Sequence, residues 1–142
     1  MPSSSMVLLV EDSTADALLT KMALGKTETA PRVEWVKHGG EALERLEALL
    51  SEQAALPALI LLDLQMPVMD GETFLHRLRE HPDLSALPVV VLTTSEDPHE
   101  VKRVYGLCAN AYLVKPVRAA DYADVLGSLD EFWLRTAKLP IS

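Results

Sequence analysis

Cysteine is nearly absent from this chain of 142 residues. A single one, Cys108, excludes a disulfide framework and a metal site built from several cysteines. Long apolar runs are missing as well. The first apolar run, Met6 to Val10, has only five residues and follows the short polar segment 1–5. Such a start is neither a signal peptide nor a membrane span, so we expect a cytoplasmic protein without a membrane partner.

Basic residues are outnumbered by acidic ones. There are 13 Lys and Arg against 21 Asp and Glu, which gives a formal net charge of −8. A surface that binds nucleic acid through its phosphates needs a basic surplus, so we expect no nucleic-acid partner. One small phosphate site remains compatible with this balance. The hydrophobic share of 49% is typical of a folded chain, and the length suits one domain.

Short apolar runs alternate with segments of helical spacing. The runs cover residues 6–10, 33–36, 59–62, 89–92 and 111–114. All are continuous except the second, which Glu34 interrupts, and continuous runs are typical of strands covered on both faces. The helical stripes are Leu18, Leu19, Met22 and Ala23; Leu43, Leu46, Leu49 and Leu50; Phe74, Leu75 and Leu78; Val101, Val104, Tyr105 and Cys108; and Tyr122, Leu126, Leu129, Trp133 and Ala137. This alternation predicts a doubly wound α/β domain with a parallel sheet.

Polar residues directly follow four of these runs, and the third is followed further on by what we interpret as an Asp-Gly turn, residues 70–71. The polar residues are Glu11, Asp12, Asp63, Thr93 and Lys115. The carboxyl ends of parallel strands share one edge of the sheet, where open α/β folds bind ligands, so these side chains should converge. Carboxylates crowded together repel, and a hard cation such as Mg²⁺ relieves that repulsion. An aspartate in such a place can accept a phosphoryl group as an acyl phosphate, while a lysine and a hydroxyl bind its oxygens.

Each of these residues also has a simpler explanation when it is taken singly. Glu11 and Asp12 can cap a helix that starts near Ser13, Asp63 can belong to a turn, Thr93 can be a loop hydroxyl, and Lys115 can be a surface lysine. All of these explanations would have to hold together at one sheet edge, which favours a joint site.

Four motifs resemble the receiver domain of two-component response regulators. They are LLVED (8–12), LLDLQMPVMDG (61–71), VVVLTTS (89–95) and AYLVKP (111–116), in the order and at the spacing of that family. The resemblance implies a flavodoxin-like (βα)5 fold with a five-stranded parallel sheet in the order 2-1-3-4-5. It covers nearly the whole chain, so residues 1–142 are predicted to form a single receiver domain with no output domain.

The resemblance also implies roles for the acidic residues. Asp63 matches the phosphoacceptor, which would explain a carboxylate at the end of a buried strand. Glu11 and Asp12 match the acidic pair that holds Mg²⁺ together with Asp63. Gln65 stands where the family supplies a backbone carbonyl to the metal.

Three further positions match the residues that respond to phosphorylation. Lys115 matches the lysine that pairs with the phosphoryl group, and the Lys115–Pro116 peptide matches one that is usually cis. Thr93 matches the hydroxyl that moves toward the phosphoryl group, and Tyr112 the aromatic that rotates with it. One departure concerns Cys108, where the family has glycine. A left-handed helix end would suit glycine there, so either the cap differs or Cys108 is strained.

The end of the chain, FWLRTAKLP (132–140), resembles the tail of stand-alone receivers that serve phytochrome-type histidine kinases. This implies a sensor histidine kinase, such as a bacteriophytochrome, as partner and signalling by altered protein binding. Phe132 and Leu134 point to either side of Trp133 on a helix, so they cannot all face one core. We therefore expect a homodimer through the C-terminal helix and tail, about 119–140, unless the tail folds back on its own domain.

Three other functions remain as alternatives. The chain could be a receiver of a phosphorelay without a phytochrome, or a degenerate receiver that is never phosphorylated. It could also be a Mg²⁺-dependent aspartyl phosphatase, but such enzymes carry a second acid two residues after the nucleophile, where this chain has Gln65. We expect a signalling protein and not an enzyme.

Overall fold

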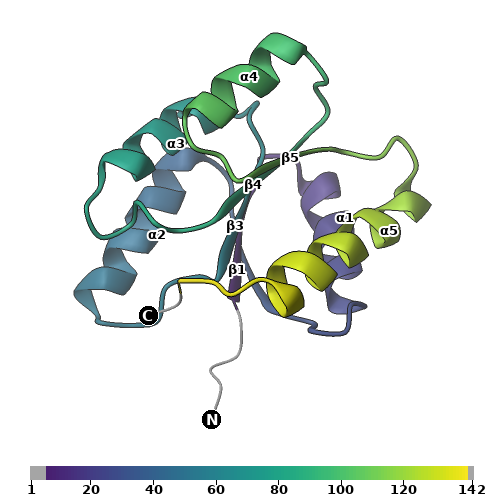
Figure 1. Ribbon diagram of the computed structural model, residues 1–142, viewed down its shortest axis with the longest axis horizontal. Coiled ribbons are helices and arrows are strands. Elements are labelled where there is room, and N and C mark those ends of the chain that lie inside the picture. Colours follow the sequence, from purple (N-terminus) through teal and green to yellow (C-terminus); the bar gives the residue numbers. More distant parts are fainter. Residues whose placement is uncertain (1–5, 141–142) are drawn as a thin grey trace.

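The computed structural model describes residues 6–140, which form a parallel sheet between two layers of helices (Figure 1). The elements are β1 (Met6–Val10), α1 (Thr14–Gly25), β2 (Arg32–Val36), α2 (Gly39–Ser51), β3 (Leu59–Leu62), α3 (Gly71–Glu80), β4 (Val89–Thr93), α4 (Pro98–Gly106), β5 (Ala111–Val114), η1 (Ala119–Asp121), α5 (Tyr122–Leu129) and η2 (Asp130–Thr136). The strands pair in the order β2-β1-β3-β4-β5, and each pair is parallel. The predicted fold and strand order are confirmed.

The strands lie where the apolar runs predicted them. β1, β3 and β4 are buried along their whole length, as expected of central strands with helices on both faces. β2 and β5 form the two edges and are only partly buried. Glu34 is tolerated in β2 because the guanidinium of Arg45 on α2 binds its carboxylate, at 2.7 Å from Nε to Oε1.

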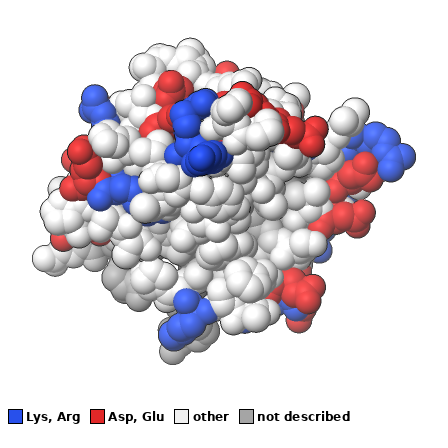
Figure 2. Space-filling model, turned by 45° about the horizontal axis from the view of Figure 1, so that its top comes forward, with Lys and Arg blue, Asp and Glu red and all other residues white. Residues whose placement is uncertain are grey.

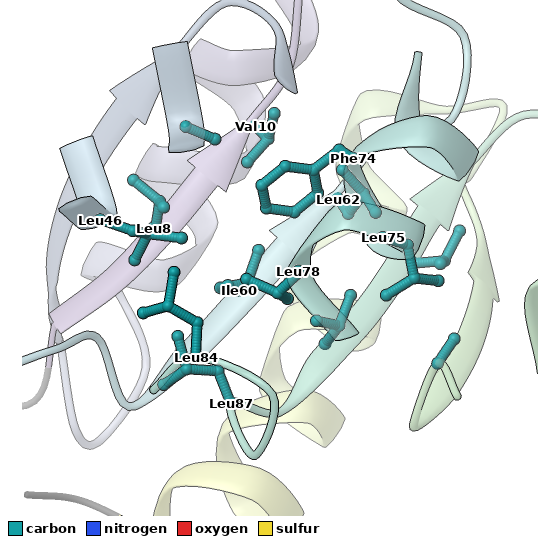
Figure 3. Close-up of a cluster of buried hydrophobic side chains, with 14 of the residues drawn as sticks. Leu8, Val10, Leu46, Ile60, Leu62, Phe74, Leu75, Leu78, Leu84 and Leu87 are labelled. Carbon is teal, nitrogen blue, oxygen red and sulfur yellow. The ribbon is translucent and has the colours of Figure 1, made fainter. Parts of the chain in front are cut away.

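The hydrophobic core has two halves, one on each face of the sheet. Successive residues of a strand point to opposite faces, so Leu8 and Val10 contact one helix layer, while Val7 and Leu9 contact the other. Figure 1 shows α2, α3 and α4 on one side of the sheet and α1 and α5 on the other. Figure 3 shows the first half, where Phe74 of α3 is fully buried among leucines of α2, α3 and the sheet.

Helix α1 turns only part of its predicted apolar stripe to the core, because Leu19 and Ala23 pack there whereas Leu18 and Met22 do not. Leu18 and Met22 are 50% and 59% exposed. Ala17, Thr20 and Leu24 are fully buried instead. The smaller residues allow α1 to lie close to α5, whereas the larger ones would hold the two helices apart. Two large apolar side chains are therefore left on the surface.

Cys108 adopts the left-handed conformation, with φ of 68°, which decides between the two possibilities left open by the sequence. Its carbonyl oxygen accepts hydrogen bonds from Nη2 and Nε of Arg79, at 2.7 and 3.2 Å. The same guanidinium donates to the carbonyls of Ser85 and Leu87. Left-handed backbone costs a non-glycine residue about 1–2 kcal/mol. The turn is kept because it closes α4 and directs the carbonyl to Arg79.

The chain after α5 departs from a regular helix. Residues Asp130–Thr136 form the wider π-helical turns of η2, so the side chains no longer follow the predicted α-helical stripe. Trp133 and Leu134 are partly buried against the core, while Phe132 is 53% exposed. The tail therefore folds back in part and leaves one aromatic on the surface. No helix among residues 6–140 is long and apolar enough to cross a membrane.

Candidate functional site

The sheet continues by one residue beyond three of its strands, and this extension carries the predicted site. The Asp63 amide donates to the Val10 carbonyl at 3.0 Å, and the Lys115 amide donates to the Thr93 carbonyl at 2.7 Å. The Glu11 amide likewise donates to β2, at 3.0 Å from the Val36 carbonyl. These ladder bonds fix the backbone from which the functional side chains project at one edge of the sheet.

Three carboxylates meet at this edge. One oxygen each of Glu11, Asp12 and Asp63 lies within 4.8 Å of the others. Glu11 and Asp63 are buried, whereas Asp12 is exposed. Carboxylate oxygens that converge from adjacent strand ends are the donors that Mg²⁺ prefers, so this set fits a hard divalent cation. Gln65 is exposed in the loop after β3, and the role of its carbonyl stays a prediction.

Lys115 lies among the acids with its side chain almost completely buried. Its Nζ is 2.7 Å from Oε1 of Glu11, 2.8 Å from Oδ2 of Asp16 and 3.5 Å from Oδ2 of Asp63. Burial disfavours the charged ammonium, but the hydrogen bonds to Asp16 and Glu11 outweigh it, so the pKa of Lys115 is raised. A fixed cation therefore stands beside the predicted phosphoacceptor.

Glu11 is the acid most affected by its surroundings. Burial raises the pKa of its carboxyl from 4.5 to about 7, and the hydrogen bond from Lys115 only partly opposes this effect. The nearby charge of Asp63 acts in the same direction as burial. The ionised form of Glu11 is therefore costly to keep, and positive charge added to this edge of the sheet would favour that form.

Asp16 was missed by sequence reasoning. It lies in the first turn of α1, and its carboxylate accepts a hydrogen bond from Lys115. The only available signal was an acid one helical turn after Asp12, at the start of a helix that points toward the strand edge. That signal is weak because acids are common in the first turn of any helix.

Asp70 and Gly71 do not form the turn that was predicted from their identity. Asp70 is the N-cap of α3, and its carboxylate accepts from the Thr73 amide at 2.8 Å. A Cβ on Gly71 would lie 2.6 Å from the Asp63 carbonyl oxygen and 2.7 Å from Cα of Leu64. Only glycine permits this approach, which packs the start of α3 against the backbone that carries Asp63.

Thr93 and Tyr112 project from the same face of neighbouring strands. Tyr112 pairs with Val91 in the register, two residues before Thr93, so the two side chains share the α3–α4 side of the sheet. Oγ1 of Thr93 is buried and has no hydrogen-bond partner within residues 6–140. Such a hydroxyl costs about 1–3 kcal/mol, and an incoming oxygen could satisfy it.

The hydroxyl of Tyr112 is well bound. It lies 2.8 Å from the Ser95 carbonyl oxygen and 3.0 Å from Oε1 of Glu100. Burial raises the pKa of this phenol to about 12, so it remains protonated at neutral pH. The Lys115–Pro116 peptide, in contrast, is trans, because no cis bond occurs among the residues described. The expectation of a cis bond at this peptide is wrong.

Comparison with known proteins identifies the family. The sequence model of the response regulator receiver domain matches residues 7–126. The chain belongs to the response regulator receiver family. Receiver domains act with histidine kinases and bind Mg²⁺ or Mn²⁺ at an acidic site. The three carboxylates at this edge of the sheet are compatible with such a site.

Two relatives match the receiver domain along most of its length. The response regulator Rcp1 of Synechocystis is 37% identical over 135 residues, which are 94% of this chain and 92% of Rcp1. The probable methanogenesis regulatory protein FilR2 of Methanothrix harundinacea is 36% identical over 134 residues, 94% of this chain and 86% of FilR2. The sequence alone therefore resembles regulators with different named roles.

Solved structures agree with the fold. The phosphorylated cyanobacterial phytochrome response regulator RcpA has a TM-score of 0.90 at 35% identity, over 97% of this chain and 99% of RcpA. The Mn²⁺-bound form of Rcp1 has a TM-score of 0.85 at 36% identity, over 96% and 99% of the two chains. The receiver domain is thus homologous to stand-alone phytochrome response regulators.

Proposed function

We propose that this receiver domain accepts a phosphoryl group on Asp63 from a sensor histidine kinase. The position of Asp63 carries the proposal, since its buried carboxylate lies beside two further acids and 3.5 Å from the Lys115 ammonium. A carboxylate oxygen of Asp63 would attack phosphorus as the bond between phosphorus and the donor's nitrogen or oxygen breaks. The product is an acyl phosphate, and the electron pair of the broken bond leaves with the donor.

The neighbouring residues would bind and neutralise the phosphoryl group. Lys115 remains a cation and would pair with a phosphoryl oxygen, and Thr93 would donate its unpaired hydroxyl to another. Glu11, Asp12, Asp63 and the Gln65 carbonyl would hold Mg²⁺, which supplies further positive charge beside the phosphoryl oxygens. Tyr112 shares the sheet face with Thr93 and would respond when Thr93 moves.

Incubation with Mg²⁺ and acetyl phosphate, followed by intact-mass analysis, tests this function. We expect one phosphate adduct per chain and none when the metal is chelated, because the crowded carboxylates would then repel the donor. Continuous hydrolysis of acetyl phosphate without an adduct would favour the aspartyl phosphatase, although Gln65 is not an acid. Absence of both reactions would favour a degenerate receiver.

A phytochrome-type kinase is the proposed donor. Two observations support it: the tail at residues 132–140 resembles that of phytochrome-associated receivers, and RcpA is named as a phytochrome response regulator. Exposed apolar side chains lie close in sequence to the site residues. They are Leu18 and Met22 on α1, which also carries Asp16, and Val117, which follows Lys115 by two residues. Faster phosphotransfer from a phytochrome-type kinase than from an unrelated one is expected. The reverse preference would favour a phosphorelay without a phytochrome.

A protein partner fits the surface better than nucleic acid. The net charge is −8, and in Figure 2 the charged side chains of the visible face lie in small groups, several of them of both signs, with uncharged surface between the groups. A nucleic-acid interface would need a broad basic area. The proposal therefore includes signalling through altered binding of proteins.

A second copy of the chain is one proposed partner. A groove of about 340 Å³ runs between β5 and the last helix, lined by Leu113, Val125, Ser128, Leu129, Phe132 and Trp133. Val114 of the adjacent edge strand is also exposed. This apolar surface continues the C-terminal segment for which we predicted a homodimer, and a two-fold contact would place Phe132 of each copy against the other copy.

Sedimentation at increasing concentration tests the homodimer. We expect dimers of the wild type and a dissociation constant at least about tenfold higher for Phe132→Ala and for a chain cut after Asp130, because both remove the exposed aromatic. Met22→Ala is the matched control, since Met22 is similarly exposed but lies on α1. A wild type that stays monomeric with and without phosphorylation would leave the groove to another partner.

A further inference from the structure

The hydroxyl of Tyr112 has two acceptors and only one proton. The Ser95 carbonyl oxygen lies at 2.8 Å and Oε1 of Glu100 at 3.0 Å. A phenol donates a single hydrogen bond, and both partners are acceptors in their ordinary states. The two oxygens therefore compete for Tyr112, and the balance between them depends on where each is held.

The two acceptors belong to parts of the molecule that are anchored differently. Ser95 follows Thr93 by two residues in the loop between β4 and α4, so its carbonyl would move with the Thr93 segment. Glu100 lies in the first turn of α4. That helix is held to α3 by the Arg103–Glu72 ion pair, at 3.2 Å, and to the core by the buried Val104. Glu100 would thus stay in place when the loop moves.

We propose that Glu100 is a positioning residue of the phosphorylation switch, whose carboxylate holds Tyr112 at α4 and so opposes its movement with Thr93. This inference rests on the proposed phosphorylation of Asp63. A hydrogen bond to a carboxylate is stronger than one to a neutral carbonyl. Tyr112 follows the Ser95 carbonyl only by leaving Glu100, so Glu100 raises the free energy of the state that receives the phosphoryl group.

Glu100 has another role from which this one must be separated. An acid in the first turn of a helix interacts favourably with the helix dipole, and Asp97 already caps α4 through the His99 amide. Loss of that interaction would lower stability without moving Tyr112. The test must therefore report on the Tyr112 ring itself and must depend on its hydroxyl.

The experiment uses the full chain labelled with 3-fluorotyrosine. The chain has three tyrosines, so each can be followed by its own ¹⁹F signal. Glu100→Gln keeps the length of the side chain and removes its charge. Without a phosphodonor, its Tyr112 signal should move toward the position seen in the phosphorylated wild type. With Mg²⁺ and acetyl phosphate, the rate of adduct formation should rise about fivefold. This factor corresponds to the difference in strength between a hydrogen bond to a charged acceptor and one to a neutral acceptor.

Two controls make the result specific. Glu96→Gln removes the same charge from the exposed loop before α4 and should change neither the signal nor the rate. In a Tyr112→Phe background, Glu100→Gln should have no further effect on the rate, because the hydroxyl is gone. An unmoved Tyr112 signal, an unchanged or slower rate, or an equal gain in the Tyr112→Phe background would overturn the proposal. A wild type that takes no phosphate would instead refute the function, and in that case a Tyr112 signal that Glu100→Gln leaves unmoved would still refute the Glu100 contact.

Discussion

Replacement of Asp63 by asparagine should abolish the phosphate adduct. The amide has nearly the shape of the carboxylate, but it carries no charge and does not attack phosphorus. The fold should be retained, because Lys115 keeps its closer partners, Glu11 at 2.7 Å and Asp16 at 2.8 Å. Intact-mass analysis after incubation with Mg²⁺ and acetyl phosphate should show less than about 1% of the wild-type adduct.

Asp124→Asn is the matched control for this substitution. Asp124 is exposed on α5 and takes no part in the ion pairs of Lys115, so its variant should form the full wild-type adduct. A full-strength adduct on Asp63→Asn would show that another side chain is the acceptor. Because Asp12 and Glu11 are the nearest carboxylates to Asp63, fragmentation of the labelled protein should then be directed to them first.

The sheet and the location of the site were predictable from the sequence, because both depend on properties of the backbone. A continuous apolar run marks a strand buried on both faces, and parallel strands put their carboxyl ends on one edge. Residues that directly follow the runs, such as Asp63 and Lys115, had to converge there. The structure adds the ladder bonds that continue past the strands, which no pattern of residue types reveals.

Features that depend on how side chains reach across the fold were not predictable. The hydrogen bonds from Lys115 to Asp16 and from Arg79 to the Cys108 carbonyl join segments far apart in the sequence. The rotation of α1 was missed because Leu18 and Met22 are more apolar than Ala17 and Thr20, although the smaller pair fits against α5. Hydrophobicity placed Leu19 and Ala23 correctly but not Leu18 and Met22, and close packing decided which residues complete the buried face.

Left-handed backbone was only partly foreseen. At Cys108 the comparison with glycine raised the question, and the hydrogen bonds of Arg79 explain the answer. Val68 has φ of 67° without being glycine, in the exposed loop between Asp63 and α3. A β-branched residue is unfavourable there, and its cost is offset by the packing of the loop ends, Leu64 and Gly71, whose backbones are hydrogen-bonded at 3.0 Å.

Lys115→Met should destabilise the domain strongly in the absence of divalent cations. Methionine fills similar space, but the buried carboxylates of Glu11 and Asp63 lose their common cation. Removal of one partner from a buried ionic cluster costs about 3–5 kcal/mol when uncompensated charge stays in the interior, but Glu11, whose pKa is already raised to about 7, can take up a proton in place of the lost cation. Asp16 is partly exposed and can be hydrated, so we expect a loss near the lower limit, about 3 kcal/mol, in the free energy of unfolding measured with urea and a chelator.

Mg²⁺ should recover much of this loss, because it adds positive charge at the same carboxylates and stabilises the folded state by binding to it. The expected pattern is thus a large difference between Lys115→Met and wild type with the chelator and a smaller one at saturating Mg²⁺. Lys102→Met, an exposed position on α4, should change stability by less than about 0.5 kcal/mol in either condition. Equal stability of Lys115→Met and wild type with the chelator would mean that the acids are neutralised by protons and not by the lysine. Lys115 would then contribute to binding of the phosphoryl group and not to the stability of the fold.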